Sequence, residues 1–161
     1  LPERRGGAPL TWAIIDGLKN LGLTLFYLDD GIDTGDIIDQ IELEISTRDT
    51  IKSMLGKIKQ ELPSFVLNNL DSVFDGTNNR IKQDENKASY TTKRSPRDGE
   101  IDWTQPKEAL YNFIRAQSPP YPCAFSRVVD KNGNVRKLAI PHVELEGSRL
   151  MIEVSLEEFN E

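Results

Sequence analysis

The sequence predicts a mixed α/β chain, and three observations support that prediction. An apolar run rich in strand-forming residues begins at Gly22, and a second, alternating segment runs from Ile37 to Ile45. A long segment from Asp49 to Phe74 then carries apolar residues at the spacing of a helix. Towards the end of the chain, two short strand-like segments flank the tight-turn dipeptide Asn132-Gly133.

The first predicted element is an amphipathic helix from Pro9 to Asn20, since proline suits a first helical turn. Its inward face consists of apolar residues at helical spacing: Leu10, Ala13, Ile14 and Leu18. A buried strand is expected next, with inward side chains Leu23, Leu25, Phe26 and Leu28.

The segment from Ile37 to Ile45 is expected to be a half-buried strand, because Glu42 and Glu44 alternate with its apolar residues. Ser46 or Thr47 is then expected to cap the helix from Asp49 to Phe74. Pro63 should kink or split this helix, because proline removes a backbone donor from a helix interior.

The second half of the chain begins with a polar segment, 75–88, that is typical of an exposed connection. A helix is expected from Pro106 to Ala116, and Trp103 before it is interpreted as a core residue. A hairpin of strands 124–129 and 135–140 and a further strand, 149–154, complete the chain. We therefore divide the chain into residues 1–75, a connecting segment with its helix over 76–123, and a small β subdomain over 124–161.

Composition limits the classes of function. The chain has 161 residues, of which 29% are charged and 37% hydrophobic, and its formal net charge is -6. This balance argues against a general nucleic-acid surface. A single cysteine and a single histidine offer no disulfide and no structural zinc site. No apolar run approaches the length of a membrane span and no signal peptide is visible, so we expect a cytoplasmic protein that is not bound to a membrane.

The most informative stretch joins the two predicted strands. Asp29, Asp30, Asp33 and Asp36 follow the first strand among Gly31 and Gly35, and these glycines could take positive φ and bring the backbone close to a ligand. On chemistry alone, a plain turn built from turn-forming residues is an equal alternative. A calcium loop is disfavoured, because the carboxylates do not follow the ligand positions of an EF-hand, and no metal site is predicted.

Three blocks of sequence resemble the 10-formyltetrahydrofolate-dependent formyltransferases. The segment Gly22 to Ile38 is similar to the family pattern G-x-T-x-x-x-x-x-x-G-x-D-x-G-D-I, and the opening L-P-E-R-R-G-G-A-P-L-T-W resembles the segment just after the family's catalytic Asn-x-His. The third block comprises I-D-W at 101–103 and R-A-Q-S-P-P-Y-P-C-A-F at 115–125, where Cys123 stands in place of the usual glycine. The blocks occur in the family order and cover about three quarters of the chain.

The resemblance implies the back portion of a Rossmann-like formyltransferase domain, followed by a helical segment and a small C-terminal β-hairpin or partial barrel. It also implies 10-formyltetrahydrofolate as the formyl donor and Asp33 as the catalytic carboxylate, which orients a histidine that lies before Leu1 together with the catalytic asparagine. Asp30 and Gly31 are expected to line the pterin pocket through backbone groups. We therefore expect the chain alone to be inactive, and an inactive fragment or a binding module is an open alternative.

The resemblance covers enzymes that formylate different acceptor amines. The tRNA enzymes of the family carry a sizeable barrel and need positive surface, whereas this chain is acidic and has about thirty-six residues after Phe125. The charge therefore favours a nucleotide-linked amino sugar, whose phosphates could be bound by Arg5 and Arg115. Methionyl-tRNA remains the alternative acceptor, and a homodimer is an open possibility.

Overall fold

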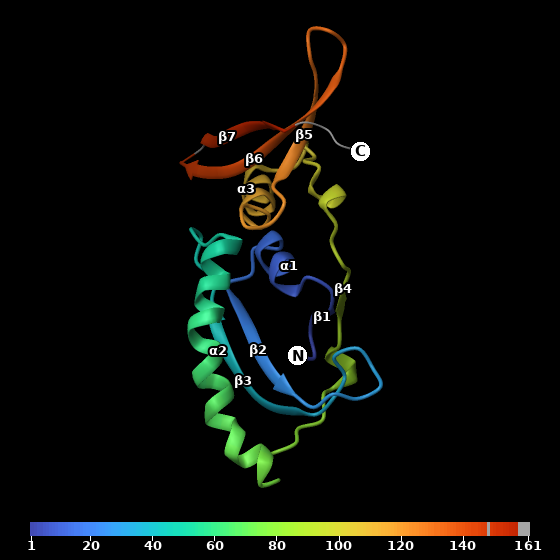
Figure 1. Cartoon of the computed structure of the whole chain (residues 1–161), viewed down its shortest axis with the longest axis vertical. Helices are drawn as coiled ribbons and strands as arrows, with labels where there is room; N and C mark the ends of the chain where they lie inside the picture. The colour runs from blue at the N-terminus through green and yellow to red at the C-terminus, as the bar shows by residue number, and fades with distance from the viewer. Residues whose placement is uncertain (148, 158–161) are drawn as a thin grey trace.

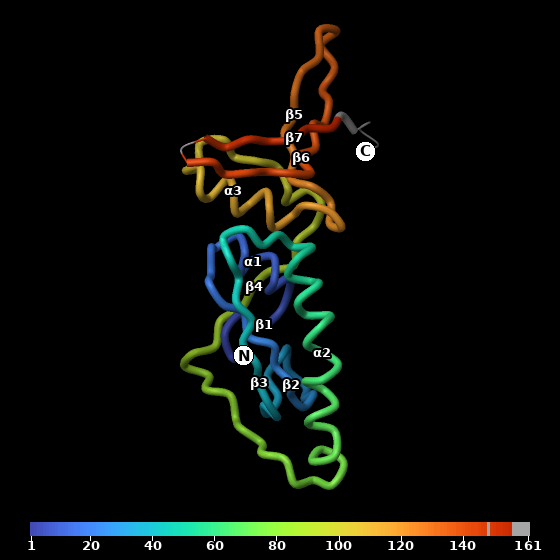
Figure 2. The backbone as a smooth tube through the Cα atoms, turned by 90° about the vertical axis from the view of Figure 1, so that its left-hand side faces the viewer, coloured from blue at the N-terminus to red at the C-terminus, as the bar shows by residue number. Residues whose placement is uncertain are grey.

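The chain folds into an elongated α/β structure (Figure 1), and the computed structural model describes residues 1–147 and 149–157. The predicted α/β class is confirmed, since helices and strands both contribute to the packed interior. The first half of the chain forms one end of the molecule and the C-terminal sheet forms the other (Figure 2). None of the helices in the described part of the chain is long and apolar enough to cross a membrane.

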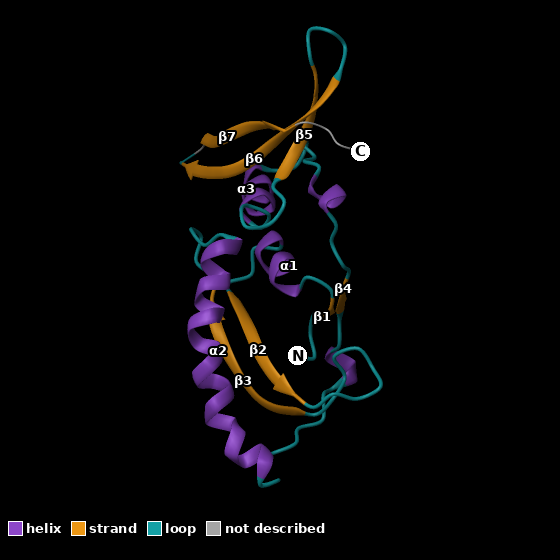
Figure 3. Ribbon diagram, in the orientation of Figure 1, coloured by secondary structure: helices purple, strands orange, loops and turns teal. Residues whose placement is uncertain are grey.

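The first half of the chain is built on an antiparallel pair of strands, β2 (Asn20–Phe26) and β3 (Ile37–Glu44). Helix α2 (Ile51–Phe74) runs along this pair and helix α1 (Pro9–Ile15) lies at one end of it (Figure 3). In β3, Leu43 is buried whereas Glu42 and Glu44 are exposed, which confirms the predicted half-buried strand.

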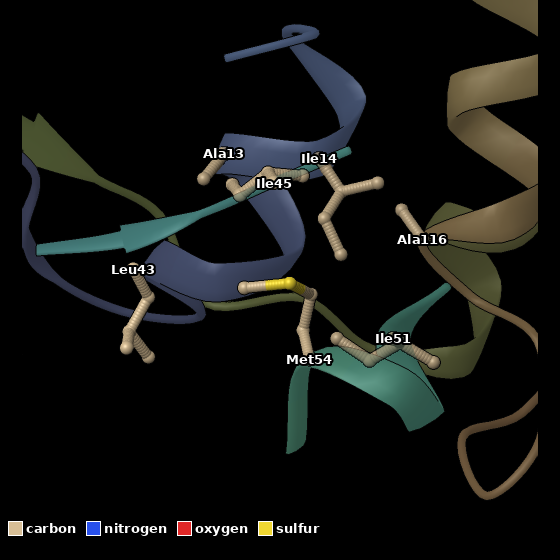
Figure 4. Packing of buried hydrophobic residues seen from close by; sticks show 7 residues of the cluster. All are labelled: Ala13, Ile14, Leu43, Ile45, Ile51, Met54 and Ala116. Atoms are coloured by element: carbon tan, nitrogen blue, oxygen red, sulfur yellow. The ribbon is translucent and has the colours of Figure 1, made fainter. Parts of the chain in front are cut away.

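A cluster of buried apolar residues holds these elements together (Figure 4). Its side chains come from α1, the end of β3, the first turn of α2 and the residue that follows α3: Ala13, Ile14, Leu43, Ile45, Ile51, Met54 and Ala116. Each fully buried Ile or Met contributes about 1.5–3 kcal/mol relative to an exposed side chain. The predicted inward residues of α1 therefore pack, since Ala13 and Ile14 are buried and Leu10 and Leu18 lie against the cluster.

Two helix boundaries differ from the prediction. Helix α1 ends at Ile15 rather than Asn20, because Gly17 takes a φ of +66° and turns the chain into β2. Helix α2 starts at Ile51, and Thr50 caps it through a reciprocal pair of hydrogen bonds with Ser53. The expected caps Ser46 and Thr47 are therefore wrong.

Helix α2 continues through Pro63, so of the two expected effects, a kink or a split, the split is wrong and the kink stays a prediction. Both Pro63 and Lys59, the residue whose carbonyl loses its partner, are exposed, so water can satisfy that carbonyl. Leu28, expected in a buried strand, lies beyond the end of β2 and is 90% exposed. Trp103 is 46% exposed, so its interpretation as a core residue is also wrong.

After α2, the chain runs beside the N-terminal segment. Strand β1 (Arg5–Gly6) pairs in parallel with β4 (Tyr90–Thr91), and short 3-10 helices, η1 (Glu85–Lys87) and η2 (Pro96–Gly99), lie on either side of β4 in the sequence. This pairing brings residues 83–91 beside the start of the chain.

The C-terminal end consists of helix α3 (Lys107–Arg115) packed against a sheet of order β5-β6-β7. Its strands are β5 (Ala124–Val129), β6 (Val135–Glu146) and β7 (Arg149–Glu157), all antiparallel. The predicted hairpin is confirmed, with Gly133 at a φ of +84° in its turn. The predicted third strand is confirmed and extends past Val154.

Candidate functional site

The loop between β2 and β3, residues 27–36, is the candidate site, and we call it the Asp-loop. Asp33 lies near its end with a φ of +57°, in the left-handed region. The Oδ2 atom of Asp33 accepts a hydrogen bond of 2.7 Å from the backbone N–H of Gly6. Aspartate is among the residues that tolerate this backbone conformation, so the loop holds its carboxylate in a defined position against β1.

Gly31 and Gly35 are needed in the Asp-loop because a side chain would not fit at either position. The expectation that they take positive φ is wrong. A Cβ atom on Gly35 would lie 1.7 Å from the carbonyl oxygen of Tyr27, and one on Gly31 would lie 2.0 Å from Oγ1 of Thr34. Neither glycine has a φ in the left-handed region. Glycine is therefore needed here for close packing of the loop against itself.

The other carboxylates shape the loop or face solvent. Asp29 accepts hydrogen bonds from the Gly31 N–H, at 3.1 Å, and from the Thr34 hydroxyl, at 2.5 Å. Asp36 forms an ion pair of 3.3 Å with Arg80. Asp30 and Gly31 are exposed at the tip of the loop, and their predicted contact with a pterin stays a prediction.

Gln83 connects the Asp-loop to the buried Arg5 in the N-terminal segment. Its amide nitrogen donates to the carbonyl oxygens of Asp33, at 2.8 Å, and Gly35, at 2.7 Å. Its amide oxygen accepts from Nε and Nη2 of Arg5, at 3.1 and 2.9 Å. The sequence analysis missed this residue, because a glutamine within a polar connection gives no signal of a specific partner.

Arg5 is fully buried, with a relative exposure of 0%. Besides Gln83, its guanidinium donates to both carboxylate oxygens of Glu85, at 2.9 and 2.7 Å, and to the hydroxyl of Tyr90, at 3.1 Å. The hydrogen bonds with Glu85 and Tyr90 raise the pKa of Arg5, and the bond with Arg5 lowers the pKa of Glu85. In this structure Arg5 therefore ties residues 83–90 to β1, and Gln83 links this segment to the Asp-loop.

Arg115 is also buried, far along the chain at the end of α3. It donates to the Asn112 side chain at 2.8 Å and, through Nη1, to the backbone carbonyls of Ser46 and Asp49. Burial lowers the pKa of Arg115. The structure does not bring Arg5 and Arg115 together and gives both of them structural contacts, so binding of an acceptor phosphate by either stays a prediction.

A cavity of about 480 Å³ lies beside Asp33. Its walls come from the N-terminal segment, α1, α2, β2 and Gln40 of β3, and they include Arg4, Leu10, Leu21, Leu23 and Phe26. Among the described residues, Oδ1 of Asp33 has no hydrogen-bond partner. The arrangement thus offers one constrained carboxylate with a remaining acceptor at the edge of a largely apolar space, which suits the orientation of a proton-bearing group.

The described part of the chain contains no group of three or more His, Cys, Asp and Glu side chains that could hold a metal ion. A fixed carboxylate on an α/β scaffold is thus the chemical feature that the described residues provide.

This fold and loop occur in the formyl transferase family. The chain belongs to the formyl transferase family, because the family model "Formyl transferase" matches residues 1–70 and the model "Formyl transferase, C-terminal domain" matches residues 93–150. Among curated relatives, a methionyl-tRNA formyltransferase from Bacillus velezensis is 36% identical over 135 residues, which are 84% of this chain and 42% of that protein. The chain thus spans less than half the length of this relative.

Solved structures agree with this assignment. A methionyl-tRNA formyltransferase from Clostridium thermocellum matches with a TM-score of 0.78 at 25% identity, over 99% of this chain and 66% of the other. An N-formyltransferase from Helicobacter canadensis in complex with folinic acid and dTDP-3-aminofucose matches with a TM-score of 0.69, over 96% of this chain and 59% of the other. At 22% identity the second match shows a shared fold alone. The family resemblance drawn from the sequence motifs is confirmed.

Proposed function

We propose that the protein transfers a formyl group from 10-formyltetrahydrofolate to a primary amine. The observation that carries the proposal is the position of Asp33, which the Gly6 N–H and the Gln83 amide hold beside the cavity. The amine attacks the formyl carbon in its neutral form, so a proton must leave the nitrogen while negative charge develops on the formyl oxygen.

Asp33 orients the group that accepts this proton and stabilises that group in its protonated form. Oδ2 is engaged by Gly6, which leaves Oδ1 to accept an imidazole N–H from a histidine outside this chain. A carboxylate in that position fixes the tautomer of the imidazole and stabilises its protonated form. Folate would supply the formyl group, and the cavity volume of about 480 Å³ fits the range of small-molecule sites.

The charge around the Asp-loop favours a small acceptor over a nucleic acid. The arginines near the loop are already paired: Arg4 with Asp16 at 2.8 Å, Arg5 with Glu85 at 2.7 Å and Arg80 with Asp36 at 3.3 Å. Binding of tRNA draws most of its affinity from cations that neutralise phosphates. We therefore propose a nucleotide-linked amino sugar as the acceptor, the class of ligand present in the Helicobacter canadensis structure.

Methionyl-tRNA is the second candidate acceptor, because the Clostridium thermocellum tRNA enzyme matches 99% of this chain. Turnover of a dTDP- or UDP-linked amino sugar and of methionyl-tRNA by the full-length protein, measured side by side at physiological salt, separates the candidates. A preference for methionyl-tRNA would reverse the proposed acceptor and leave formyl transfer standing.

Asp33→Asn in the full-length enzyme tests the proposed chemistry. Asparagine tolerates positive φ and can still accept from Gly6, so the melting temperature should stay within a few degrees. Loss of the charge should lower kcat by about two to four orders of magnitude. Asp36→Asn is the matched control, and a larger loss of kcat in the control than in Asp33→Asn would mean that the wrong carboxylate has been assigned.

A further inference from the structure

The guanidinium of Arg5 uses every hydrogen-bond donor that an arginine side chain has. Nε and Nη2 donate to Oε1 of Gln83, and Nη1 and Nη2 donate to the two carboxylate oxygens of Glu85. Nη1 also donates to the hydroxyl of Tyr90. Arginine carries five N–H groups, so these five bonds leave none for a ligand. The side chain is also fully buried, so an acceptor phosphate could contact Arg5 only by displacing one of these partners.

The bonds from Arg5 fix the orientation of the Gln83 amide. Arginine offers donors and no acceptor, so the amide oxygen of Gln83 must face Arg5 and the amide nitrogen must face the opposite side. That nitrogen donates to the carbonyl oxygens of Asp33, at 2.8 Å, and Gly35, at 2.7 Å. A flipped amide would place its oxygen against these two carbonyls and its N–H groups against those of Arg5. The guanidinium therefore decides that Gln83 holds the backbone of residues 33–35.

Strand β1 holds Asp33 at a second point. The backbone N–H groups of Arg5 and Gly7 donate to the segment that contains β4, at 2.8 and 3.0 Å. The N–H of Gly6 lies between them in the sequence and donates instead to Oδ2 of Asp33, at 2.7 Å. Asp33 is thus held at its carboxylate by Gly6 and at its backbone by Gln83.

The partners of Arg5 differ in how much they depend on it. The side chain of Glu85 is 68% exposed, and Tyr90 is also exposed. Water can therefore satisfy both groups if an apolar residue replaces Arg5. Gln83 is half-buried and would lose the partner that sets its amide orientation. Removal of Arg5 should thus affect the Asp-loop through Gln83.

We propose that Arg5 is a positioning residue for Asp33 and that it acts through Gln83. Arg5 does not touch the Asp-loop with its side chain, and its effect is to keep the Gln83 amide directed at the loop carbonyls. A catalytic group that is misplaced by about 1 Å can lose two orders of magnitude in rate. The expected effect of Arg5 on kcat rests on the proposed function, whereas its effect on the position of Asp33 does not.

Amide hydrogen exchange of the 161-residue chain, followed by NMR, tests the position of Asp33 without an assay of activity. The Gly6 amide reports the bond to Asp33, and the Gly7 amide reports the pairing of β1 with β4. After correction for intrinsic rates, we expect Arg5→Met to raise the exchange rate of Gly6 about tenfold and that of Gly7 by less than about threefold. Arg5→Lys keeps the charge and can still donate to Gln83, so it should raise the Gly6 rate less.

Gln83→Glu tests whether Arg5 acts through Gln83. Glutamate keeps an acceptor for Arg5 but cannot donate to the loop carbonyls, so the Gly6 amide should exchange about tenfold faster. The double variant Arg5→Met/Gln83→Glu should add little to either single variant, because both interrupt the same connection. Lys87→Gln is the matched control, since Lys87 is exposed in the same segment, and it should leave the Gly6 rate within about twofold.

Kinetics of the full-length enzyme separate positioning from acceptor binding. Arg5→Met should lower kcat about tenfold and leave the KM for the amino-sugar nucleotide within about twofold. A raised KM with an unchanged kcat would assign Arg5 to the acceptor and overturn the proposal.

The exchange data decide the proposal in three further ways. An unchanged Gly6 rate in Arg5→Met would overturn it, and so would an equal rise at Gly6 and Gly7, which would mean that Arg5 only stabilises β1. Additive effects in the double variant would show that Arg5 does not act through Gln83. Circular dichroism verifies the folding of each variant, and Arg5→Lys keeps the test valid if Arg5→Met unfolds. If the full-length wild type transfers no formyl group, the proposed function fails, and the exchange rates still decide whether Arg5 positions Asp33.

Discussion

Replacement of Asp49 by Asn should destabilise the chain in a manner that depends on pH. Asp49 lies at the start of α2, where its carboxylate accepts from the Ser46 N–H at 2.7 Å, the Ser53 hydroxyl at 2.7 Å and Lys57 at 2.6 Å. Burial raises the pKa of this carboxyl, but the bonds from Lys57, Ser53 and Ser46 outweigh burial and lower the pKa from 3.8 to about 2.

The shifted pKa sets the size of the effect. A difference of one in pKa corresponds to about 1.4 kcal/mol, so the charged carboxylate stabilises the native state by at most about 2.4 kcal/mol. Lys57 is 39% exposed, and water screens its share of the interaction. We therefore expect Asp49→Asn to lower the free energy of unfolding at pH 7 by about 1–2 kcal/mol.

The sign of the pH dependence follows from the lowered pKa. The stabilisation is fully present above the unfolded-state value of 3.8 and is lost as the pH falls towards about 2. Roughly half of it should be gone at pH 3. The difference between wild type and Asp49→Asn should therefore shrink between pH 5 and pH 3.

Urea denaturation at several pH values measures this difference, with Asp71→Asn on the exposed face of the same helix as the control. A destabilisation by Asp49→Asn below about 0.5 kcal/mol at pH 7 would refute the reasoning, since that is the scale of a neutral surface change. A difference that stays constant from pH 7 to pH 3 would refute it equally.

Three further predictions concern the Asp-loop and the activity of the chain. Gly35→Ala places a Cβ atom 1.7 Å from the Tyr27 carbonyl and should cost about 1–3 kcal/mol in urea denaturation, whereas Gly22→Ala, with nothing within 4 Å, should change stability by less than Gly35→Ala. Gln83→Leu leaves donors of the buried Arg5 unpaired and should lower the free energy of unfolding by about 1–3 kcal/mol; an unchanged urea midpoint would argue against the network. The 161-residue chain alone should release no tetrahydrofolate from 10-formyltetrahydrofolate with an amino-sugar nucleotide, because residues that work as a unit lose orders of magnitude in rate when members are missing; measurable release would contradict this expectation.

Periodic patterns predicted most of the secondary structure. The alternation of Glu42 and Glu44 with apolar neighbours located β3, and the Asn132-Gly133 turn located the C-terminal hairpin. The predicted helix boundaries were wrong where a single residue decides whether the helix ends. Gly17 ends α1 early. Helix α2 continues through Pro63, because the Lys59 carbonyl that lacks a hydrogen bond there belongs to an exposed residue.

The candidate site was only partly predictable. Sequence motifs located the Asp-loop, and the family to which the chain belongs is confirmed, whereas the catalytic role of Asp33 stays a prediction. The contacts of Arg5 could not be foreseen, because its partners Gln83, Glu85 and Tyr90 lie about 80 residues away in a segment without periodicity. Long-range polar contacts of this kind depend on the tertiary fold, and local pattern carries no information about them.

The parallel pairing of Arg5–Gly6 with Tyr90–Thr91 has a consequence for the order of events during synthesis. The strands β2 and β3 and helix α2 can pack as soon as residue 74 has left the ribosome, because their contacts are local in sequence. The Asp-loop lacks Gln83 and the partners of Arg5 until residue 91 has emerged. The scaffold is therefore expected to form before the site, and a nascent chain halted between these points would present a folded hairpin and helix whose Asp-loop lacks the hydrogen bonds from Gln83.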